Sequence, residues 1–164
     1  QSRHAKVLAR VAEAADWGRP AEGRFQGLAL HESFGSVVGE VVEVSLADGK
    51  ARIERIVCVV DCGIAVNPDV VRMQAESAIV YALSAALHGE ITIAEGAVVQ
   101  NNFDDYPVLR IDECPPIEVH IVASDAVPSG IGEPPTPPLA PALANALFAA
   151  TGRRQRELPL ELAS

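Results

Sequence analysis

The sequence has few cysteines, no excess of positive charge and no long apolar run free of charged residues. Of its 164 residues, 13 are lysine or arginine and 22 are aspartate or glutamate, which gives a formal net charge of −9. An acidic chain without a basic stripe cannot neutralise nucleic-acid phosphates, so we expect no nucleic-acid partner. Because no uncharged apolar run reaches about 18 residues, we expect neither a transmembrane helix nor a membrane partner.

The three cysteines, Cys58, Cys62 and Cys114, are an odd number without a repeated spacing. Such a set is a poor basis for a disulfide framework. Cys58 and Cys62 lie in an apolar run, and no histidine stands at ligand spacing from them. We interpret them as small buried side chains and predict no metal site made by protein ligands. An iron–sulfur cysteine pattern is also missing.

The rest of the composition is that of a globular domain. Hydrophobic residues make up 49% of the chain and charged residues 21%, which is typical of a packed domain rather than a disordered one. The length suits a single domain over residues 1–164. No basic start leads into an apolar segment, so we expect no signal peptide. Since an export signal can sit elsewhere in a complete protein, cytoplasm and periplasm both stay open.

The first part of the chain predicts a helix and then a long hairpin. Residues 3–16 carry apolar side chains on one stripe and charges on the other, which is typical of an amphipathic helix. The stripe consists of Val7, Leu8, Val11 and Ala15. Residues 37–61 are rich in β-branched side chains, and the pair Asp48-Gly49 between them is a strong hairpin signal. We expect this antiparallel hairpin to be deeply buried at its far end.

A second helix is predicted over residues 67–90. Asn67 suits the N-cap, and Pro68 suits the first helical position. Between residues 71 and 87 the pattern is apolar nearly all round, so we expect this helix to be buried.

The remaining segments complete the prediction of the fold. They are a hairpin turning at Glu95-Gly96, a strand over 117–124, a proline-rich run over 134–141 and a closing helix within 139–151. We interpret the proline-rich run as a stiff connector. Strands and helices do not alternate one for one, so we expect an α+β fold: a mainly antiparallel or mixed sheet with long hairpins and packed helices.

One carboxylate, Glu133, stands among glycines and prolines just before the closing helix. Gly130 and Gly132 would permit a positive φ and a close approach of the backbone to a ligand. Pro134 and Pro135 fix the chain that follows. A carboxylate in such a stiff apolar turn has the setting of a general acid or base. The alternative is a solvated glutamate in a surface turn, and spacing alone leaves both open.

Gln74 and Glu76 are polar residues in the otherwise apolar helix over 67–90. A buried helix tolerates such groups only when they have partners. Those partners are either backbone groups of the same domain or a bound cofactor, and the pattern alone permits either.

Three segments resemble the C-terminal part of the large subunit of molybdenum hydroxylases, the family of xanthine dehydrogenase and aldehyde oxidase. They are VVDCGIAVNPDVVRMQAESAIVYALSAALHGEIT (59–92), NNFDDYPVLRIDECPPIEVHIV (101–122) and GIGEPPTPPLAPALANALFAATGRRQRELPL (130–160). The type most resembled is the beta subunit of isoquinoline 1-oxidoreductase, and the likeness covers nearly the whole chain. It implies that the chain is part of a molybdopterin-binding domain.

The resemblance also implies a chemistry. The family binds a molybdenum–pterin cofactor, in bacteria usually as the molybdopterin cytosine dinucleotide. It hydroxylates a carbon of an aldehyde or N-heterocycle, a small-molecule substrate, with oxygen from water. The catalytic base is the glutamate of a G-x-G-E motif, which falls here on Gly130, Gly132 and Glu133. The cofactor-contacting glutamine of the family matches Gln74.

Two departures from the family pattern stand out. The family motif Gln-x-Glu-Gly-Gly has Ser77 and Ala78 in place of its two glycines, which brings side chains to a place of close approach. Family large subunits are also several times longer. We therefore expect either a fragment or a split subunit, inactive without the missing N-terminal part. The implied partners are that part and an iron–sulfur small subunit. The alternative is a non-catalytic remnant or assembly module of the same fold.

Overall fold

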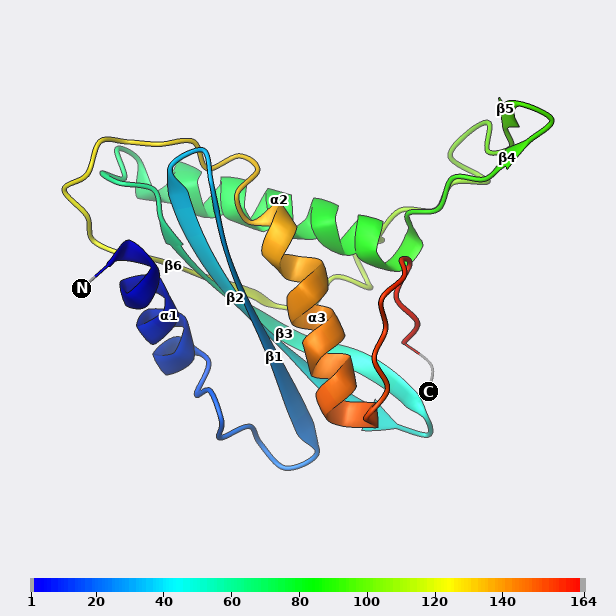
Figure 1. Cartoon of the computed structure of the whole chain (residues 1–164), viewed down its shortest axis with the longest axis horizontal. Helices are drawn as coiled ribbons and strands as arrows, with labels where there is room; N and C mark the ends of the chain where they lie inside the picture. Colours follow the sequence, from blue (N-terminus) through cyan, green and yellow to red (C-terminus); the bar gives the residue numbers. More distant parts are fainter. Residues whose placement is uncertain (1, 163–164) are drawn as a thin grey trace.

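The computed structural model describes residues 2–162 and shows a four-stranded mixed sheet with helices on both faces (Figure 1). The strand order is β1-β2-β3-β6, in which the first two pairs are antiparallel and the last is parallel. The strands are Arg24–Ser33 (β1), Ser36–Ala47 (β2), Lys50–Asp61 (β3) and Ile117–Ile121 (β6). The predicted α+β fold with a mixed sheet and long hairpins is confirmed.

The predicted hairpin over residues 37–61 forms the centre of this sheet. Val37 is the register partner of Asp61, and the strands turn at Asp48 and Gly49, whose φ angles are 51° and 72°. Two successive positive φ angles are those of a type I′ turn, whose twist matches that of paired strands. Residues 56–63 are all buried, so the far end of the hairpin is deep in the core as predicted.

Helix α1, Arg3–Ala14, covers one face of the sheet. Val7, Val11 and Ala15 are fully buried in a cluster with sheet valines. These valines are Val37, Val41, Val57 and Val59. Leu8, which the predicted stripe included, is 43% exposed. It follows Val7 by one residue, and that step turns its side chain by about 100° away from the sheet.

Helices α2, Pro68–His88, and α3, Thr136–Thr151, cover the opposite face. The side chain of Asn67 caps α2 as predicted. The prediction that α2 is wholly buried is wrong, because the sheet and α3 cover only one of its sides. On the other side, Met73 is 59% and Tyr81 72% exposed.

Helix α3 begins at Thr136, within the run that was interpreted as a connector, so that interpretation is wrong. Pro137 and Pro138 lie in its first turn, where backbone N–H groups have no intrahelical acceptor, and the missing N–H therefore costs little. The helix ends at Gly152, which has a φ of 72°, as predicted.

Helix α3 lies directly on β1 at Gly27. A Cβ atom at Gly27 would lie 2.1 Å from the carbonyl oxygen of Ala142 and 2.1 Å from the nitrogen of Ala146. Only a residue without a side chain permits this approach. The contact fixes α3 against the sheet and thereby the place of the segment that precedes α3.

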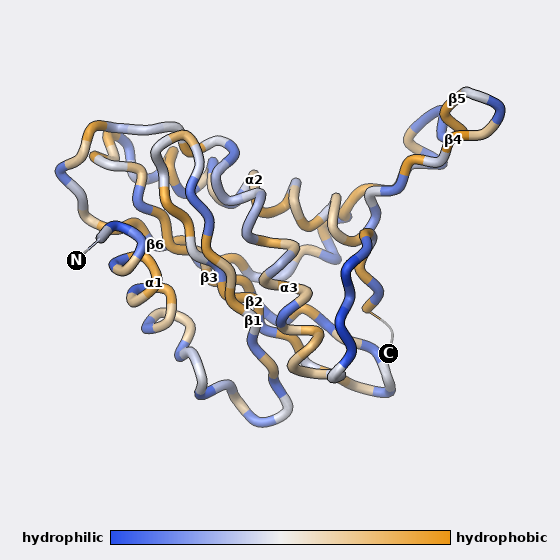
Figure 2. The backbone as a smooth tube through the Cα atoms, viewed as in Figure 1, coloured by the Kyte–Doolittle hydropathy of each residue, from blue (hydrophilic) through white to orange (hydrophobic). Residues whose placement is uncertain are grey.

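A short hairpin projects away from the body of the molecule (Figure 1). Its strands are β4, Ile93–Ala94, and β5, Ala97–Val98, and they turn at Glu95-Gly96 as predicted. Residues 90–99 are all exposed, and Ile93 is 72% exposed. Figure 2 shows that much of this arm is hydrophobic.

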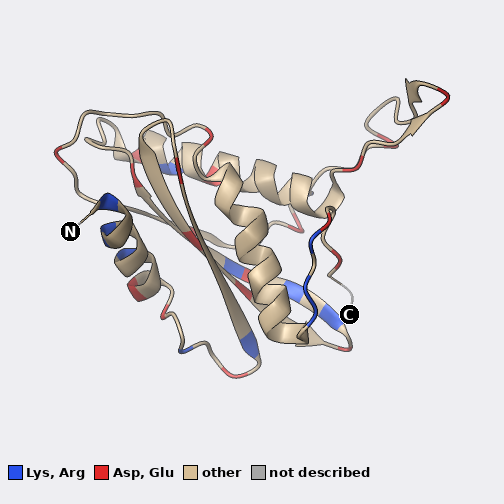
Figure 3. Ribbon diagram, viewed as in Figure 1, with Lys and Arg blue, Asp and Glu red and all other residues tan. Residues whose placement is uncertain are grey.

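Charged side chains are spread unevenly over the fold. Figure 3 shows basic residues on α1, at the β2–β3 end of the sheet and along the segment that follows α3, while α3 itself carries none. None of the helices in residues 2–162 has the length and apolar character needed to cross a bilayer.

Candidate active site

Glu133 lies in the short segment between β6 and α3, immediately before the helix. The amide of Thr136 donates to the carbonyl oxygen of Glu133 at 2.8 Å, and Pro134 and Pro135 are buried. The backbone of Glu133 is thus tied to the first turn of α3, while its side chain is exposed. Within residues 2–162 the carboxylate forms no hydrogen bond or ion pair.

The carboxylate of Glu133 lines a cavity of about 570 Å³. Three segments form the walls: the β1–β2 turn, the exposed side of α2 and the start of α3. The lining residues are Ser33, Phe34, Ser77, Ala78, Tyr81, Gly132, Glu133, Thr136 and Pro137. The sequence pointed to an apolar setting, and the walls are mostly apolar, but the carboxylate itself is not enclosed by this chain.

The predicted cofactor residue Gln74 lies close to this cavity. A Cβ atom at Gly132 would be 3.8 Å from Oε1 of Gln74, so α2 and the Glu133 turn meet at this point. Gln74 is exposed and makes no hydrogen bond within the part of the chain that the structure describes. A free amide and a free carboxylate therefore stand near the same opening, with no side chain on Gly132 between them.

Gly130 lies on the other side of the turn. A Cβ atom there would be 3.6 Å from Cβ of Phe34, so this glycine faces the β1–β2 turn. Neither Gly130 nor Gly132 has a positive φ, so this turn does not use the left-handed conformation that glycine permits. A Cβ atom at either glycine would make only ordinary van der Waals contacts, so the stiffness of the turn must come from other contacts.

Those contacts are hydrogen bonds from two serines. The hydroxyl of Ser36, which is fully buried, donates to the carbonyl oxygen of Gly130 at 2.6 Å and lies 2.8 Å from the hydroxyl of Ser129. Ser129 is also 3.1 Å from the carbonyl oxygen of Gly35. No local sequence pattern predicts this arrangement, because the two serines are 93 positions apart.

An ion pair supports the same end of the sheet. Arg3 binds the Asp61 carboxylate through Nε at 3.0 Å and Nη2 at 2.8 Å, and donates from Nη1 to the carbonyl oxygen of Gly35 at 2.7 Å. Asp61 is 1% exposed. The hydrogen bond from Arg3 is the main cause that lowers the pKa of Asp61 below its ordinary value. Sequence reasoning placed Arg3 on the solvent face of its helix and missed this role.

The two residues that replace the family glycines are placed differently. Ser77 is exposed in the cavity wall near Glu133, whereas Ala78 is buried at 5% exposure. The extra methyl group of Ala78 is therefore largely packed in the core, and Ser77 is the substitution that changes the surface of the cavity.

Polar and titratable side chains are also buried away from this cavity. Cys58 and Cys62 are buried, as predicted, and neither forms a disulfide within the described residues. Glu40, which sequence reasoning did not single out, is fully buried opposite Cys58, and neither of its carboxyl oxygens has a hydrogen-bond partner among residues 2–162. Burial raises the pKa of Glu40 well above its ordinary value. A thiol is a weak donor, so Cys58 offsets little of that cost.

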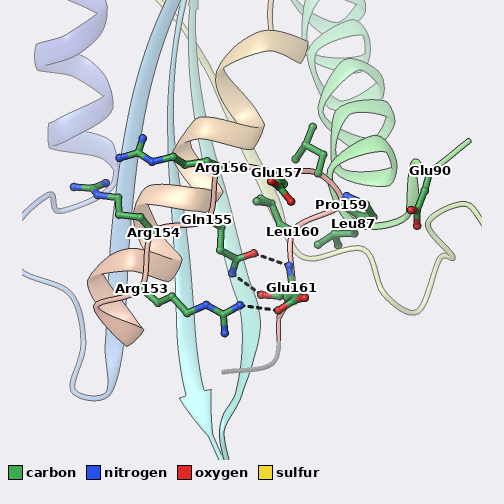
Figure 4. Close-up of a pocket in the computed structure, with 11 residues that line it drawn as sticks. Leu87, Glu90, Arg153, Arg154, Gln155, Arg156, Glu157, Pro159, Leu160 and Glu161 are labelled. Atoms are coloured by element: carbon green, nitrogen blue, oxygen red, sulfur yellow. Dashed lines mark hydrogen bonds and ion pairs between the residues drawn. The ribbon is translucent and has the colours of Figure 1, made fainter.

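A larger cavity, of about 670 Å³, lies at the opposite end of α3 (Figure 4). The segment after the helix lines this cavity, and several of its polar side chains bind one another. Arg153 binds Glu161 at 3.0 Å, and the side chain of Gln155 forms two hydrogen bonds with the backbone of Glu161. None of the predicted site residues lies there. The cavity at Glu133 is therefore the candidate active site, although it is the smaller one.

Comparison with known proteins shows the family to which the chain belongs. Residues 7–115 match the family model described as molybdopterin cofactor-binding domain. The chain is 34% identical to the isoquinoline 1-oxidoreductase subunit beta of Brevundimonas diminuta, over 96% of this chain and 21% of that protein. It is 31% identical to the aldehyde oxidoreductase molybdenum-binding subunit PaoC of Escherichia coli K12, over 76% of this chain and 18% of that protein.

Solved structures show the same fold. Quinoline 2-oxidoreductase from Pseudomonas putida 86 matches with a TM-score of 0.65 at 24% identity, over 71% of this chain and 16% of that chain. The chain spans about a fifth of the length of the curated relatives it matches. It therefore belongs to the molybdopterin-binding domains of the large subunits of molybdenum hydroxylases.

Proposed function

We propose that this chain is the base-bearing part of a molybdenum-cofactor hydroxylase that oxidises an aldehyde or an N-heterocycle with water as the oxygen source. The observation that carries the proposal is the state of Glu133: a free, exposed carboxylate on a tightly held backbone at the rim of a cavity. The names of the two curated relatives supply the substrate classes.

The residues at this rim fit one edge of a large polar cofactor. The free amide of Gln74 and the backbone at Gly130 and Gly132 are available to hold it, and the missing side chain of Gly132 leaves room beside Gln74. We propose the molybdopterin cytosine dinucleotide as the form bound. When bound, this group supplies the redox-active metal that takes up the two electrons of the oxidation.

The role of the chain itself is to place a base. The carboxylate of Glu133 accepts a proton from the oxygen that is added to the substrate, and its backbone bond to Thr136 keeps it at the cavity rim. A general base acts well only when it is held within hydrogen-bond reach of the proton that it takes. Phe34 and Tyr81 add apolar wall to the same cavity and help to exclude water.

The cavity in this chain is one wall of such a site. Gln74 and Glu133 are both exposed, and a half-open surface cannot hold a large cofactor tightly. We propose that the part of the large subunit that this chain does not span supplies the other wall, and that an iron–sulfur small subunit takes the electrons away. Activity then requires the assembled complex.

The test is Glu133→Gln in the assembled complex. The amide keeps the shape of the side chain but cannot accept the proton, so we expect turnover with an artificial electron acceptor to fall by about 10²- to 10⁴-fold. Molybdenum content should be unchanged, since Glu133 is not a ligand in this proposal. The matched control is Glu95→Gln on the projecting hairpin, which should keep full turnover. Full turnover of Glu133→Gln would contradict the proposed role.

A second candidate function is a non-catalytic remnant or assembly module. The observation that favours it is Ser77, whose side chain occupies the cavity wall where the family has a glycine. Metal analysis of the purified wild-type complex separates the two functions. A hydroxylase contains about one molybdenum per large subunit, whereas a remnant contains none.

A further inference from the structure

We propose that Ser36 is a positioning residue for Glu133: its buried hydroxyl fixes the Gly130–Glu133 turn to the sheet. The inference rests on the proposed function, because the placement of a base matters only if Glu133 acts as one. Ser36 is the first residue of β2 and does not line the cavity, so it can act on Glu133 only by positioning it.

The hydrogen bonds of Ser36 have one consistent direction. A carbonyl oxygen only accepts, so the single hydroxyl proton of Ser36 goes to Gly130 at 2.6 Å. The one proton of the Ser129 hydroxyl is then shared between Oγ of Ser36 at 2.8 Å and the carbonyl oxygen of Gly35 at 3.1 Å. Ser36 is 0% exposed, so its hydroxyl is held inside the protein and makes its hydrogen bonds to protein groups. Loss of this hydroxyl leaves the carbonyl oxygen without a protein donor at that end of the turn.

The bond from Ser36 restrains the backbone in the middle of the turn, beside the packing of Ile131 against the core. On one side, the amide of Ser129 donates to the carbonyl oxygen of Cys62 at 2.9 Å, and on the other, Thr136 binds Glu133 at 2.8 Å. Within residues 2–162, the backbone of residues 130–132 makes no other hydrogen bond than the one from Ser36. Neither glycine in this stretch has a positive φ that would lock it.

Ser36 is itself held on a rigid platform. Arg3 joins the carbonyl oxygen of Gly35, the residue before Ser36, to the buried carboxylate of Asp61 at the end of β3. Asp61 also accepts from the amide of Gly63 at 3.1 Å. These bonds connect α1, the β1–β2 turn and the end of β3. The Ser36 hydroxyl, held by this platform, in turn fixes the backbone of the Glu133 turn through its hydrogen bond to Gly130.

The test compares Ser36→Ala with Ser45→Ala in the assembled enzyme. Ser45 lies on the same strand at its other end, where its hydroxyl donates to Glu54 at 2.6 Å, so it is a matched loss of one hydroxyl far from the cavity. For Ser36→Ala, we expect hydrogen exchange at the amides of residues 131–133 to rise about tenfold. We expect kcat per molybdenum to fall about tenfold at unchanged KM. Ser36→Thr, which keeps the hydroxyl, should restore both.

The outcomes separate the positioning role from the base role. If Ser36→Ala behaves like Ser45→Ala in exchange and in kcat while Glu133→Gln is inactive, the positioning role is overturned and the base role stands. If Glu133→Gln keeps full turnover, the base role fails, and the positioning role that rests on it fails too, even if exchange rises. A uniform loss of stability, with KM and kcat per molybdenum unchanged, would also overturn the positioning role.

A second variant covers the case in which Ser36→Ala does not fold. Ser129→Ala removes the other hydroxyl of the pair at a partly exposed position. It keeps the bond from Ser36 to Gly130 but frees Ser36 from its own donor, so we expect exchange at residues 131–133 to rise about threefold. Exchange equal to that of the wild type would contradict the proposal.

Discussion

Glu133 and Glu40 are both carboxylates without a hydrogen-bond partner in the described part of the chain, but they lie in opposite environments. Glu40 is fully buried in the central strand β2, on the face that carries α2 and α3, and burial raises its pKa. Glu133 is exposed at a cavity rim. In the core, burial of Glu40 without a partner favours the protonated carboxyl group. At the cavity rim, the missing partner leaves Glu133 available to a ligand.

The two regions also differ in how the backbone is held. Glu40 lies in a regular ladder, paired with Ala29 on one side and Cys58 on the other. Glu133 follows a stretch without secondary structure, which depends on side-chain hydrogen bonds, two buried prolines and the contact with α3. A change in the irregular region should therefore move Glu133 without affecting the surroundings of Glu40.

The largest loss of stability in the region before Glu133 is expected from Gly63→Ala. Gly63 has a φ of 74°, and a Cβ atom there would lie 2.2 Å from the carbonyl oxygen of Val127. The substitution forces the segment before Glu133 away from the end of β3. We expect a loss of about 3 kcal/mol in the free energy of unfolding, from overpacking and the left-handed backbone together, measured by urea denaturation.

Gly18→Ala is the control for this variant. Gly18 has a φ of 81°, but no atom of the described part of the chain lies within 4 Å of the place of a Cβ atom. Only the strain of the left-handed backbone, about 1 kcal/mol, is therefore expected. Equal losses for Gly63→Ala and Gly18→Ala would show that the segment before Glu133 is not packed against β3 as described.

A smaller change, in the pH dependence of the free energy of unfolding, is expected from Glu40→Gln. Because the pKa of Glu40 is raised above its ordinary value of 4.5, the folded chain keeps a proton that the unfolded chain releases. The stability that the folded chain gains from binding this proton is complete below pH 4.5 and declines as the pH rises toward the pKa of the folded state. Glutamine does not titrate. From pH 5 to pH 8 the variant should therefore gain stability relative to wild type, by at most about 1.4 kcal/mol per pH unit.

The measurement is urea unfolding of wild type and Glu40→Gln at both pH values. Glu95→Gln is the control, because it removes a carboxylate that is exposed in the folded chain. A difference between wild type and Glu40→Gln that is the same at pH 5 and pH 8 would contradict the neutral, buried state of Glu40 and remove the contrast with Glu133.

The smallest effect is expected from Ser77, on the α2 wall of the cavity. Ser77→Gly removes the side chain that departs from the family motif, and should raise the molybdenum retained per complex after dialysis by about twofold. Ser77→Leu should lower it, since the larger side chain projects into the cavity. If both variants retain as much molybdenum as wild type, Ser77 does not lie against the cofactor.

Local signals predicted much of this fold. The Asn67 cap, the Asp48-Gly49 turn and the Glu95-Gly96 turn depend on neighbouring residues, and all three lie where the sequence put them. The motif over 130–133 brought Glu133 and Gly132 to the same cavity, with Gln74 beside Gly132.

The features that were missed depend on residues far apart in the chain. Ser36 and Ser129 meet across 93 positions, and no local pattern marks a serine for such a contact. The buried state of Glu40 depends on which face of β2 receives α3, and the exposed side of α2 depends on what covers it. The start of α3 was missed because prolines are tolerated in a first turn, which the sequence pattern did not weigh.

The most direct test of the account is the rate at which substrate reduces the assembled enzyme in a single turnover, with wild type and Glu133→Gln compared at equal molybdenum content. This rate reports the chemical step without product release or the electron acceptor. The account predicts a reduction rate slower by about 10²- to 10⁴-fold in Glu133→Gln, at unchanged substrate affinity. A variant reduced as fast as wild type would contradict the assignment of Glu133 as the base.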